Sequence, residues 1–360
     1  MHRIGIDLGG TKTELIVTGE NPLDVIEKKR VETERSGYQA LLKQLEDLVD
    51  SVGNLALENP AVGLGAPGFV DPKTGAVGSS NLRPLSFKPF QEDLQKRLGM
   101  PVRVVNDANC FALSEALHGA GKGYGMVLGI ILGTGMGGGL VLDGKLWSGS
   151  QGIAGEWGHA TVNPEGPACY CGRRGCQELY LSGTGIQRMY RERTGSDLGV
   201  QQIFEASQEG NDADAVQVME IFLETFGQAL GNLVMSLDPD VIVIGGGVSN
   251  LPILYKEGLQ RVSVQVFQGR QNIRIVQNQL GDSSGVYGAA AAAGHGLNPG
   301  KFWLRVWVAR TVLGLMLLVM ASNPSRAAES WACAGYTLAE YLIPGLGYGL
   351  MGDFRQNAHF

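Results

Sequence analysis

The chain has 360 residues, of which 44% are apolar and 18% are charged, a balance typical of globular enzymes rather than of disordered or fibrous chains. Its formal net charge of −6 argues against general nucleic-acid binding, because nucleic-acid-binding surfaces are usually basic. The length predicts about two domains, each able to bury its own core.

The first predicted element is a β-hairpin. Residues 3–7 and 14–17, in "RIGIDLGGTKTELIV", have the pattern of two strands, and Gly9 and Gly10 lie at the turn between them. Because this strand begins almost at once, we expect no N-terminal targeting segment. Asp7 ends the first strand, where its carboxylate could hold Mg²⁺ through water.

Helices and strands alternate along the rest of the chain. Apolar spacing predicts helices over 38–52, 212–237 and 284–294, a buried strand over 61–68, and a second Gly-rich hairpin over 125–146. This alternation indicates an α/β fold. The two Gly-tipped hairpins, each opening one half of the chain, suggest duplicated lobes around one cleft.

Three Gly-rich turns follow predicted strands, at 7–11, 133–139 and 245–247. Backbone N–H groups in such turns can hold phosphate, and ligands of α/β folds collect at the carboxyl ends of strands. One such turn is more often only a turn, but three together favour a nucleotide site. None of them fits the P-loop or the Rossmann pattern.

Asp107 is the candidate catalytic base. It follows the apolar strand of "PVRVVNDANCF", so its carboxylate could accept a hydroxyl proton as that oxygen attacks a γ-phosphate. The alternative is that Asp107 caps the helix that begins there, since Asn and Asp are good N-caps. The neighbouring Gly-rich turns favour catalysis.

The segment "GHATVNPEGPACYCGRRGC" gathers one His and three Cys. One nitrogen and three sulfurs form a closed ligand set that predicts a structural zinc site, and the alternative is four unrelated loop residues. Clustered cysteines also point to a reducing, cytoplasmic compartment rather than to disulfides. The predicted zinc ligands are His159, Cys169, Cys171 and Cys176.

A zinc ion here would fix the loop, residues 158–178, that carries further polar side chains. Glu156, His159 and Glu178 are spaced to converge on one ligand. Carboxylates can accept paired hydrogen bonds from hydroxyl groups, so we expect these side chains to hold a polyhydroxyl compound such as a sugar.

At this point the chain resembles the ROK family (repressors, open reading frames and kinases) of the actin-like ATPase superfamily. The resemblance covers about residues 1–294. It rests on seven segments in order: "IGIDLGGTKTE", "NDANCFALSEA", "ILGTGMGGGL", "GEWGH", "CYCGRRGCQELYLSGTG", "DPDVIVIGGGVSN" and "GDSSGVYGAA".

The resemblance implies a two-lobed, ribonuclease H-like fold with an inserted zinc loop. Residues 1–118 would form the N-terminal lobe, to which 284–296 return as a helix, and 119–283 the C-terminal lobe. It also implies a sugar kinase that uses ATP and Mg²⁺, with a homodimer expected and no nucleic-acid partner. A sugar-sensing regulator is the alternative from another class, although no helix-turn-helix precedes Asp7.

Carried over by position, the resemblance assigns the remaining roles. Asp107 would be the base, and the sugar would be held by Asn81, Asn106, Asp107, Glu156, His159 and Glu178. The phosphates and adenosine would be held by Asp7, Gly9, Gly10, Thr11, Lys12, Gly133, Thr134, Gly135, Gly137, Gly245, Gly246 and Gly247.

The sugar is predicted less directly. "GEWGH" and "GDSSGV" are similar to the fructokinase and mannokinase branch, which makes fructose, phosphorylated at its 6-hydroxyl, the first expectation. The segment over 79–90 departs from the fructokinase pattern at Ser79 and Pro84. N-acetylglucosamine and glucose are the alternatives, because "NDANCFALSEA" and "GIILGTG" occur equally in the N-acetylglucosamine kinase branch.

The tail, residues 300–360, does not follow the family pattern. Three basic residues, Lys301, Arg305 and Arg310, precede an apolar run over 311–322 that is short for a membrane span, and "SRAAE" follows. A fused or misread neighbouring gene, a membrane anchor, and an extra packed helix are the three interpretations. Cys333 has no evident partner in any of them.

Overall fold

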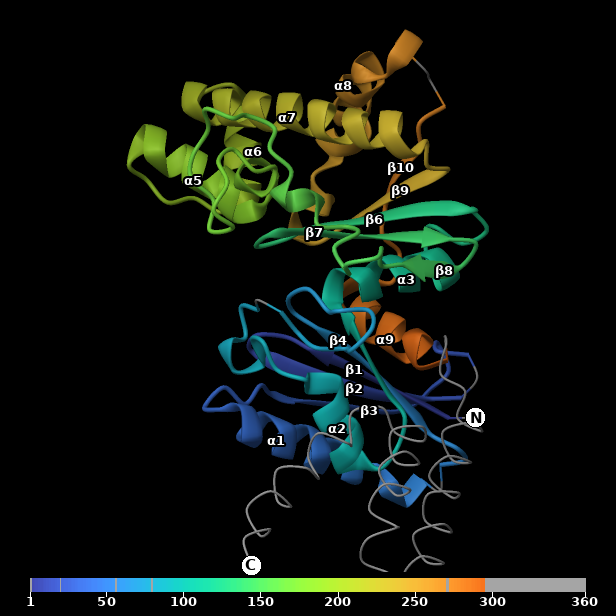
Figure 1. Ribbon diagram of the computed structural model, residues 1–360. Helices are drawn as coiled ribbons and strands as arrows, with labels where there is room; N and C mark the ends of the chain where they lie inside the picture. The colour runs from blue at the N-terminus through green and yellow to red at the C-terminus, as the bar shows by residue number, and fades with distance from the viewer. Residues whose placement is uncertain (1, 20, 56, 79, 270–271, 295–360) are drawn as a thin grey trace, which may run out of the picture. The chain divides into compact units, whose positions relative to one another are not determined.

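The computed structural model describes residues 2–19, 21–55, 57–78, 80–269 and 272–294 (Figure 1). One compact unit, Met1–Leu297, contains two five-stranded sheets. The first sheet has the order β3-β2-β1-β4-β5, in which β1 pairs antiparallel with β2 and parallel with β4. Its strands are β1 (Arg3–Leu8), β2 (Lys12–Thr18), β3 (Val25–Glu32), β4 (Ala61–Ala66) and β5 (Val102–Asn106).

The second sheet repeats this pattern. Its order is β10-β9-β6-β7-β8, and β6 pairs antiparallel with β7 and parallel with β9. Each sheet therefore has a hairpin in the same position, and a parallel strand pairs with the hairpin's first strand and with a second parallel strand beyond it. The strands are β6 (Met126–Leu132), β7 (Met136–Leu142), β8 (Lys145–Trp147), β9 (Val241–Gly245) and β10 (Ile275–Gln277).

Helices α1 (Tyr38–Asp50) and α2 (Phe90–Leu98) share one core with the first sheet. The apolar residues of α1 recur every three or four positions, so they form one buried stripe. Leu41 and Leu45 of that stripe are buried in the same core as Ile4 and Ile6 of β1.

Helices α3 (Asp107–His118) and α9 (Ser284–Gly294) pack against each other between the two sheets (Figure 1). Helix α3 contacts β6 and β7, and α9 contacts β1 and β4. Small residues make this close packing possible. A Cβ added to Gly63 would lie 1.8 Å from the carbonyl oxygen of Ala289, and one added to Gly288 would lie 1.8 Å from that of Cys110.

The remaining helices share a separate core with the second sheet, on the face opposite α3 (Figure 1). The longest is α7, which begins where the Asp212 side chain accepts a hydrogen bond from the Ala215 N–H at 2.9 Å and ends before Asp238 in the left-handed region. These helices are α4 (Glu178–Leu181), α5 (Gly183–Thr194), α6 (Val200–Glu209), α7 (Ala213–Leu237) and α8 (Glu257–Gln265).

The predicted elements agree with these bounds. Both predicted hairpins are present as β1–β2 and β6–β7, and the predicted helix over 212–237 is α7 with its cap. The two-sheet α/β architecture is confirmed, whereas the boundaries of the two lobes remain a prediction. The tail over 300–360 lies outside the described residues. None of the helices within the described residues combines the length and the hydropathy of a transmembrane span.

Candidate active site

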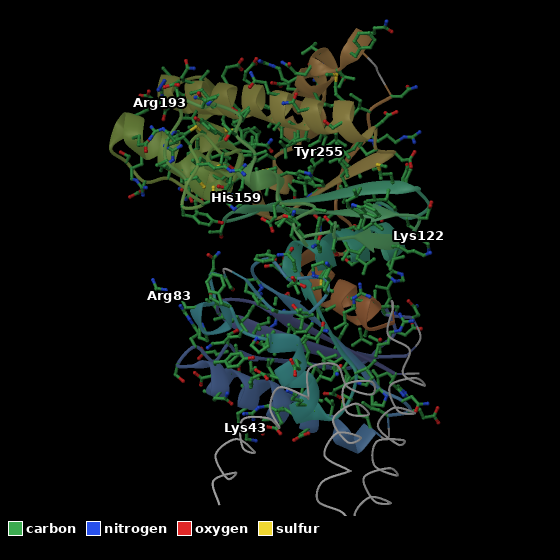
Figure 2. All side chains as sticks on the ribbon, viewed as in Figure 1. Lys43, Arg83, Lys122, His159, Arg193 and Tyr255 are labelled. Atoms are coloured by element: carbon green, nitrogen blue, oxygen red, sulfur yellow. The ribbon has the colours of Figure 1, made fainter. Side chains whose placement is uncertain are left out.

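A cavity of about 930 Å³ collects most of the predicted site residues. Its walls come from the start of α3, the β6–β7 turn, the loop after β4 and the segment that follows β8. Figure 2 shows His159 below α5 and α7, on the side that faces the first sheet. The predicted residues that line the cavity are Asn81, Asn106, Asp107, Gly133, Thr134, Gly135, Gly137, Glu156, His159, Cys171 and Glu178.

Asp107 is the first residue of α3, directly after β5. The N-cap of the helix is Asn106, whose side-chain oxygen accepts from the Asn109 N–H at 3.1 Å, so capping does not account for Asp107. The Asp107 carboxylate accepts from the Ala108 N–H at 2.8 Å. Burial raises the Asp107 pKa to about 6; the Ala108 N–H opposes this shift, and the Asp7 and Glu156 carboxylates add to it.

Asn106, predicted as a sugar contact, is only 8% exposed. Besides its capping bond, it donates from Nδ2 to the Gly68 carbonyl at 3.0 Å. Both ends of this amide therefore bind protein groups and join the loop after β4 to the start of α3. Its carbonyl oxygen retains a second lone pair, so a sugar contact stays a prediction.

Glu156 and Glu178 approach the cavity from different segments. Glu178, the first residue of α4, accepts a hydrogen bond from the Met136 N–H at 2.9 Å and so ties α4 to the β6–β7 turn. Glu156 precedes the short 3₁₀ helix Trp157–His159. Burial raises the pKa of Glu156, the His159 ring opposes this shift, and the Glu178 carboxylate adds to it.

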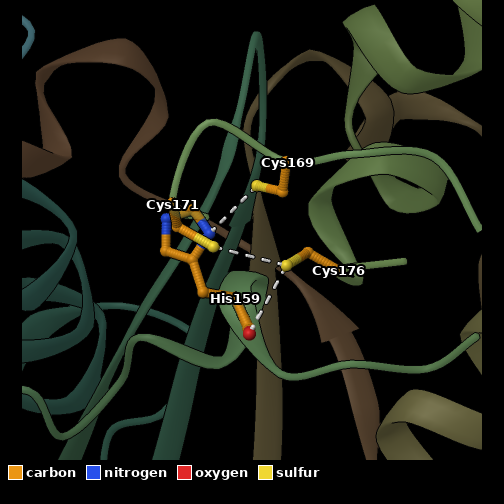
Figure 3. Close-up of side chains that lie close together, drawn as sticks. All are labelled: His159, Cys169, Cys171 and Cys176. Atoms are coloured by element: carbon orange, nitrogen blue, oxygen red, sulfur yellow. Dashed lines mark hydrogen bonds between the residues drawn. The ribbon is translucent and has the colours of Figure 1, made fainter. Parts of the chain in front are cut away.

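The four predicted zinc ligands lie together (Figure 3). One ligand atom from each of them falls within 4.8 Å of the others, and His159 Nδ1 lies 3.7 Å from Cys169 Sγ. Gly172 and Gly175 have φ values of 89° and 59°, as a chain turning tightly around an ion requires. One nitrogen and three sulfurs at this spacing fit a structural zinc site.

Only one of the three predicted phosphate-binding turns lines the cavity in the structure. The β6–β7 turn lines the cavity, whereas the predicted residues of the β1–β2 turn and of the turn after β9 are not among the described cavity-lining residues. These residues are Asp7, Gly9, Gly10, Thr11, Lys12, Gly245, Gly246 and Gly247.

Two of the turns nevertheless lie beside cavity residues. A Cβ added to Gly246 would lie 2.5 Å from the Leu132 carbonyl oxygen, so the turn after β9 packs on the start of the β6–β7 turn. Asp7 interacts electrostatically with Asp107. Burial, with a smaller contribution from Glu14, raises the Asp7 pKa to about 6, while Lys12 and Arg30 oppose the shift.

Several large side chains that line the cavity were not predicted from the sequence, among them those of Trp157, Tyr170 and Arg173. Arg173 donates to the His159 carbonyl at 3.4 Å, and the Tyr170 hydroxyl lies 2.9 Å from His159 Nε2. Tyr170 and Arg173 lie within the predicted zinc loop, and Trp157 lies just before it. That placement was the available signal, although it could not indicate which way the side chains point.

Known proteins of similar sequence match about four fifths of this chain. An N-acetyl-D-glucosamine kinase of Pasteurella multocida (strain Pm70) is 42% identical over 300 residues, covering 80% of this chain and 98% of that protein.

Two solved structures share the fold. A ROK hexokinase from Thermus thermophilus matches with a TM-score of 0.74 and 33% identity, over 82% of this chain and 98% of that one. A ROK family glucokinase from Streptomyces griseus, in complex with glucose and AMPPNP, matches with a TM-score of 0.67 and 31% identity, over 82% and 100%. The model of the ROK family matches residues 3–295. The chain belongs to the ROK family.

Proposed function

We propose that the protein transfers the γ-phosphoryl group of ATP to the 6-hydroxyl of N-acetyl-D-glucosamine. The family match supports a sugar kinase, and so do the relatives named as kinases, because the match to them covers nearly their whole length. The identity of the sugar is the more specific part of the proposal. The names of the relatives do not support fructose, and they favour the N-acetylglucosamine alternative.

The observation that carries the proposal is the meeting of the Asp107 carboxylate, whose pKa is raised, with three other polar side chains in a single cavity. Asp107 lines the cavity together with Glu156, His159 and Glu178. A pKa of about 6 leaves Asp107 mostly ionised at neutral pH, yet more basic than an ordinary aspartate. Such a group suits the removal of a proton from a sugar hydroxyl.

The proposed reaction is an in-line transfer of the γ-phosphoryl group from ATP to the sugar. The 6-hydroxyl oxygen attacks the γ-phosphorus, the bond from that phosphorus to the β-bridging oxygen breaks, and ADP leaves. The hydroxyl proton passes to the Asp107 carboxylate. Little covalent chemistry is required of the protein, so positioning and charge stabilisation supply most of the rate.

The glycine turns would hold the nucleotide. Gly133, Thr134, Gly135 and Gly137 line the cavity, and backbone N–H groups of such turns bind phosphate oxygens. Asp7 would hold Mg²⁺, which supplies positive charge to the phosphates. An ionised Asp7 is costly where it is buried, and a bound cation would offset that cost.

The zinc ion would be structural. His159, Cys169, Cys171 and Cys176 would fill its coordination, which leaves no open position for a reacting group. Its role would be to hold the loop that carries His159 and leads into Glu178.

The test is to identify the product. The enzyme, with ATP and Mg²⁺, should convert N-acetylglucosamine to one phosphate ester whose NMR spectrum shows phosphorus coupling at carbon 6. The matched control is 6-deoxy-N-acetylglucosamine, which lacks the accepting hydroxyl. It should compete with the substrate without being phosphorylated. A phosphate on another carbon would refute the assignment of the 6-hydroxyl.

A further inference from the structure

His159 has two ring nitrogens that face different neighbours. Nδ1 lies 3.7 Å from Cys169 Sγ, on the side of the three cysteines (Figure 3). Nε2 is therefore the nitrogen that remains for a ligand in the cavity. When Nδ1 gives its lone pair to a metal, the ring proton resides on Nε2, which can then only donate.

Nε2 already has a partner within the protein. The Tyr170 hydroxyl lies 2.9 Å from Nε2, and the two rings meet edge to face with centroids 5.0 Å apart. Tyr170 also lines the cavity, so a ligand that bonded to Nε2 there would have to displace this hydroxyl.

Tyr170 is not held in this place by packing. The residue is 74% exposed, and it lies between Cys169, which is buried, and Cys171, which is exposed. Rotating it away from His159 would cost little beyond the hydrogen bond and the ring contact, because it fills no core position.

We propose that the Tyr170 hydroxyl is a displaceable latch, which occupies His159 Nε2 while the sugar site is empty and leaves when a sugar hydroxyl binds there. This inference rests on the proposed function, since it takes the sugar to bind at His159. Tyr170 is thus a positioning residue. It presets the His159 ring and at the same time competes with the substrate.

A competing internal contact lowers apparent affinity by the fraction of molecules in which the site is open. One neutral hydrogen bond contributes about 0.5–1.5 kcal/mol net, which corresponds to roughly two- to tenfold in a binding constant. Removing only the hydroxyl should therefore tighten sugar binding by roughly two- to tenfold.

The experiment compares the full-length, zinc-loaded wild type with Tyr170→Phe. Calorimetry gives the dissociation constant for N-acetylglucosamine without nucleotide, and steady-state rates give KM and kcat. Tyr124→Phe is the matched control, since the Tyr124 ring packs on Arg274 outside this site. Metal analysis checks that all variants hold the same zinc.

The expected result is a dissociation constant and a sugar KM roughly two- to tenfold lower for Tyr170→Phe only. An unchanged or weakened affinity would overturn the latch and make Tyr170 a bystander or a direct sugar contact. If Phe lowers the zinc content, Tyr170→Leu replaces it with the same expected gain. A wild type that binds no N-acetylglucosamine would instead refute the proposed function, so the two failures are distinguishable.

Discussion

The surroundings of Asp107 raise the pKa of its carboxylate, which suits it to act as a base but makes its ionised form destabilise the fold. The local sequence fits two roles, base or helix cap, and only the neighbouring Gly-rich turns favoured the base. The structure assigns the cap to Asn106 and leaves the Asp107 carboxylate in the cavity. Burial then raises its pKa, a tertiary effect that no local motif contains.

The substitution Asp107→Asn separates these effects. Turnover should fall on the order of 10²-fold or more, since the base is lost, while sugar binding measured by calorimetry stays near wild type. Because the folded pKa, about 6, exceeds the ordinary value of 3.8, ionisation destabilises the fold as pH rises from about 4 through 6.

Asn carries no charge, so the variant should unfold at higher denaturant concentration than wild type at pH 7.5 and lose that advantage near pH 4. Near-normal turnover would contradict the assignment of the base. If the variant were less stable than wild type at pH 7.5, the claim that ionised Asp107 destabilises the fold would be wrong.

At the scale of elements, the zinc loop was the part most readily predicted. Cys-x-Cys-x₄-Cys with a nearby His is a compact local pattern, and the structure brings all four side chains together. The partners of the loop were not predictable in the same way. The hydrogen bond that Met136 donates to Glu178 and the one between Tyr170 and His159 depend on how segments separated in the sequence meet.

Replacing Cys171 by Ser should release zinc and weaken sugar binding together. One thiolate is lost from a closed set, and the loop that carries His159 is no longer fixed. Metal analysis and sugar calorimetry on the same sample provide the check. Glu165→Gln, an exposed change in the same loop, is the control. Wild-type protein purified without chelators that contains no zinc would rule the site out.

A second element-scale feature, the Glu115 clamp, was not visible in the sequence. The carboxylate of Glu115, fully buried on α3, accepts backbone N–H bonds from Ala120 at 2.9 Å, Gln279 at 3.1 Å and Leu280 at 2.9 Å. It thus joins both segments in which the chain crosses between the sheets, after α3 and before α9. Residues 164 positions apart meet only once the fold exists.

Glu115→Ala should lower the free energy of unfolding by about 3 kcal/mol or more, because it leaves three part-buried backbone N–H groups without their acceptor. Urea unfolding measures this. Glu192→Ala on α5 removes an exposed carboxylate paired with Arg188 and should change stability by under about 1 kcal/mol. Equal losses of unfolding free energy in the two variants would show that the buried Glu115 carboxylate stabilises the fold no more than an exposed ion pair does.

At the scale of the whole molecule, the duplicated plan was predictable. Two alternating apolar stretches with Gly-rich tips indicated two hairpins, and each hairpin lies in the corresponding place of its sheet. The joining of the two sheets through α3 and α9 was not predictable, since it depends on close contacts such as that of Gly288 with Cys110. The lobe boundaries and the homodimer stay predictions.

The kinase should not require residues 300–360. The ROK family match ends at residue 295, and α9 already completes its packing on β1 and β4. A chain ending at Pro299 should keep its turnover and be more soluble, because an exposed apolar run over 311–322 would promote association. Activity assays and sedimentation of both forms decide this. Unfolding, or loss of activity in a folded truncated enzyme, would make the tail an integral part.

The most direct test of the account is a competition among sugars. The enzyme receives ATP, Mg²⁺ and equal concentrations of N-acetylglucosamine, glucose and fructose, and mass spectrometry follows each phosphorylated product from the start. The ratio of initial rates equals the ratio of kcat/KM values. We predict that N-acetylglucosamine phosphate forms first and in excess over the other two. Preferential phosphorylation of fructose or glucose, or no phosphorylated sugar at all, would contradict the account.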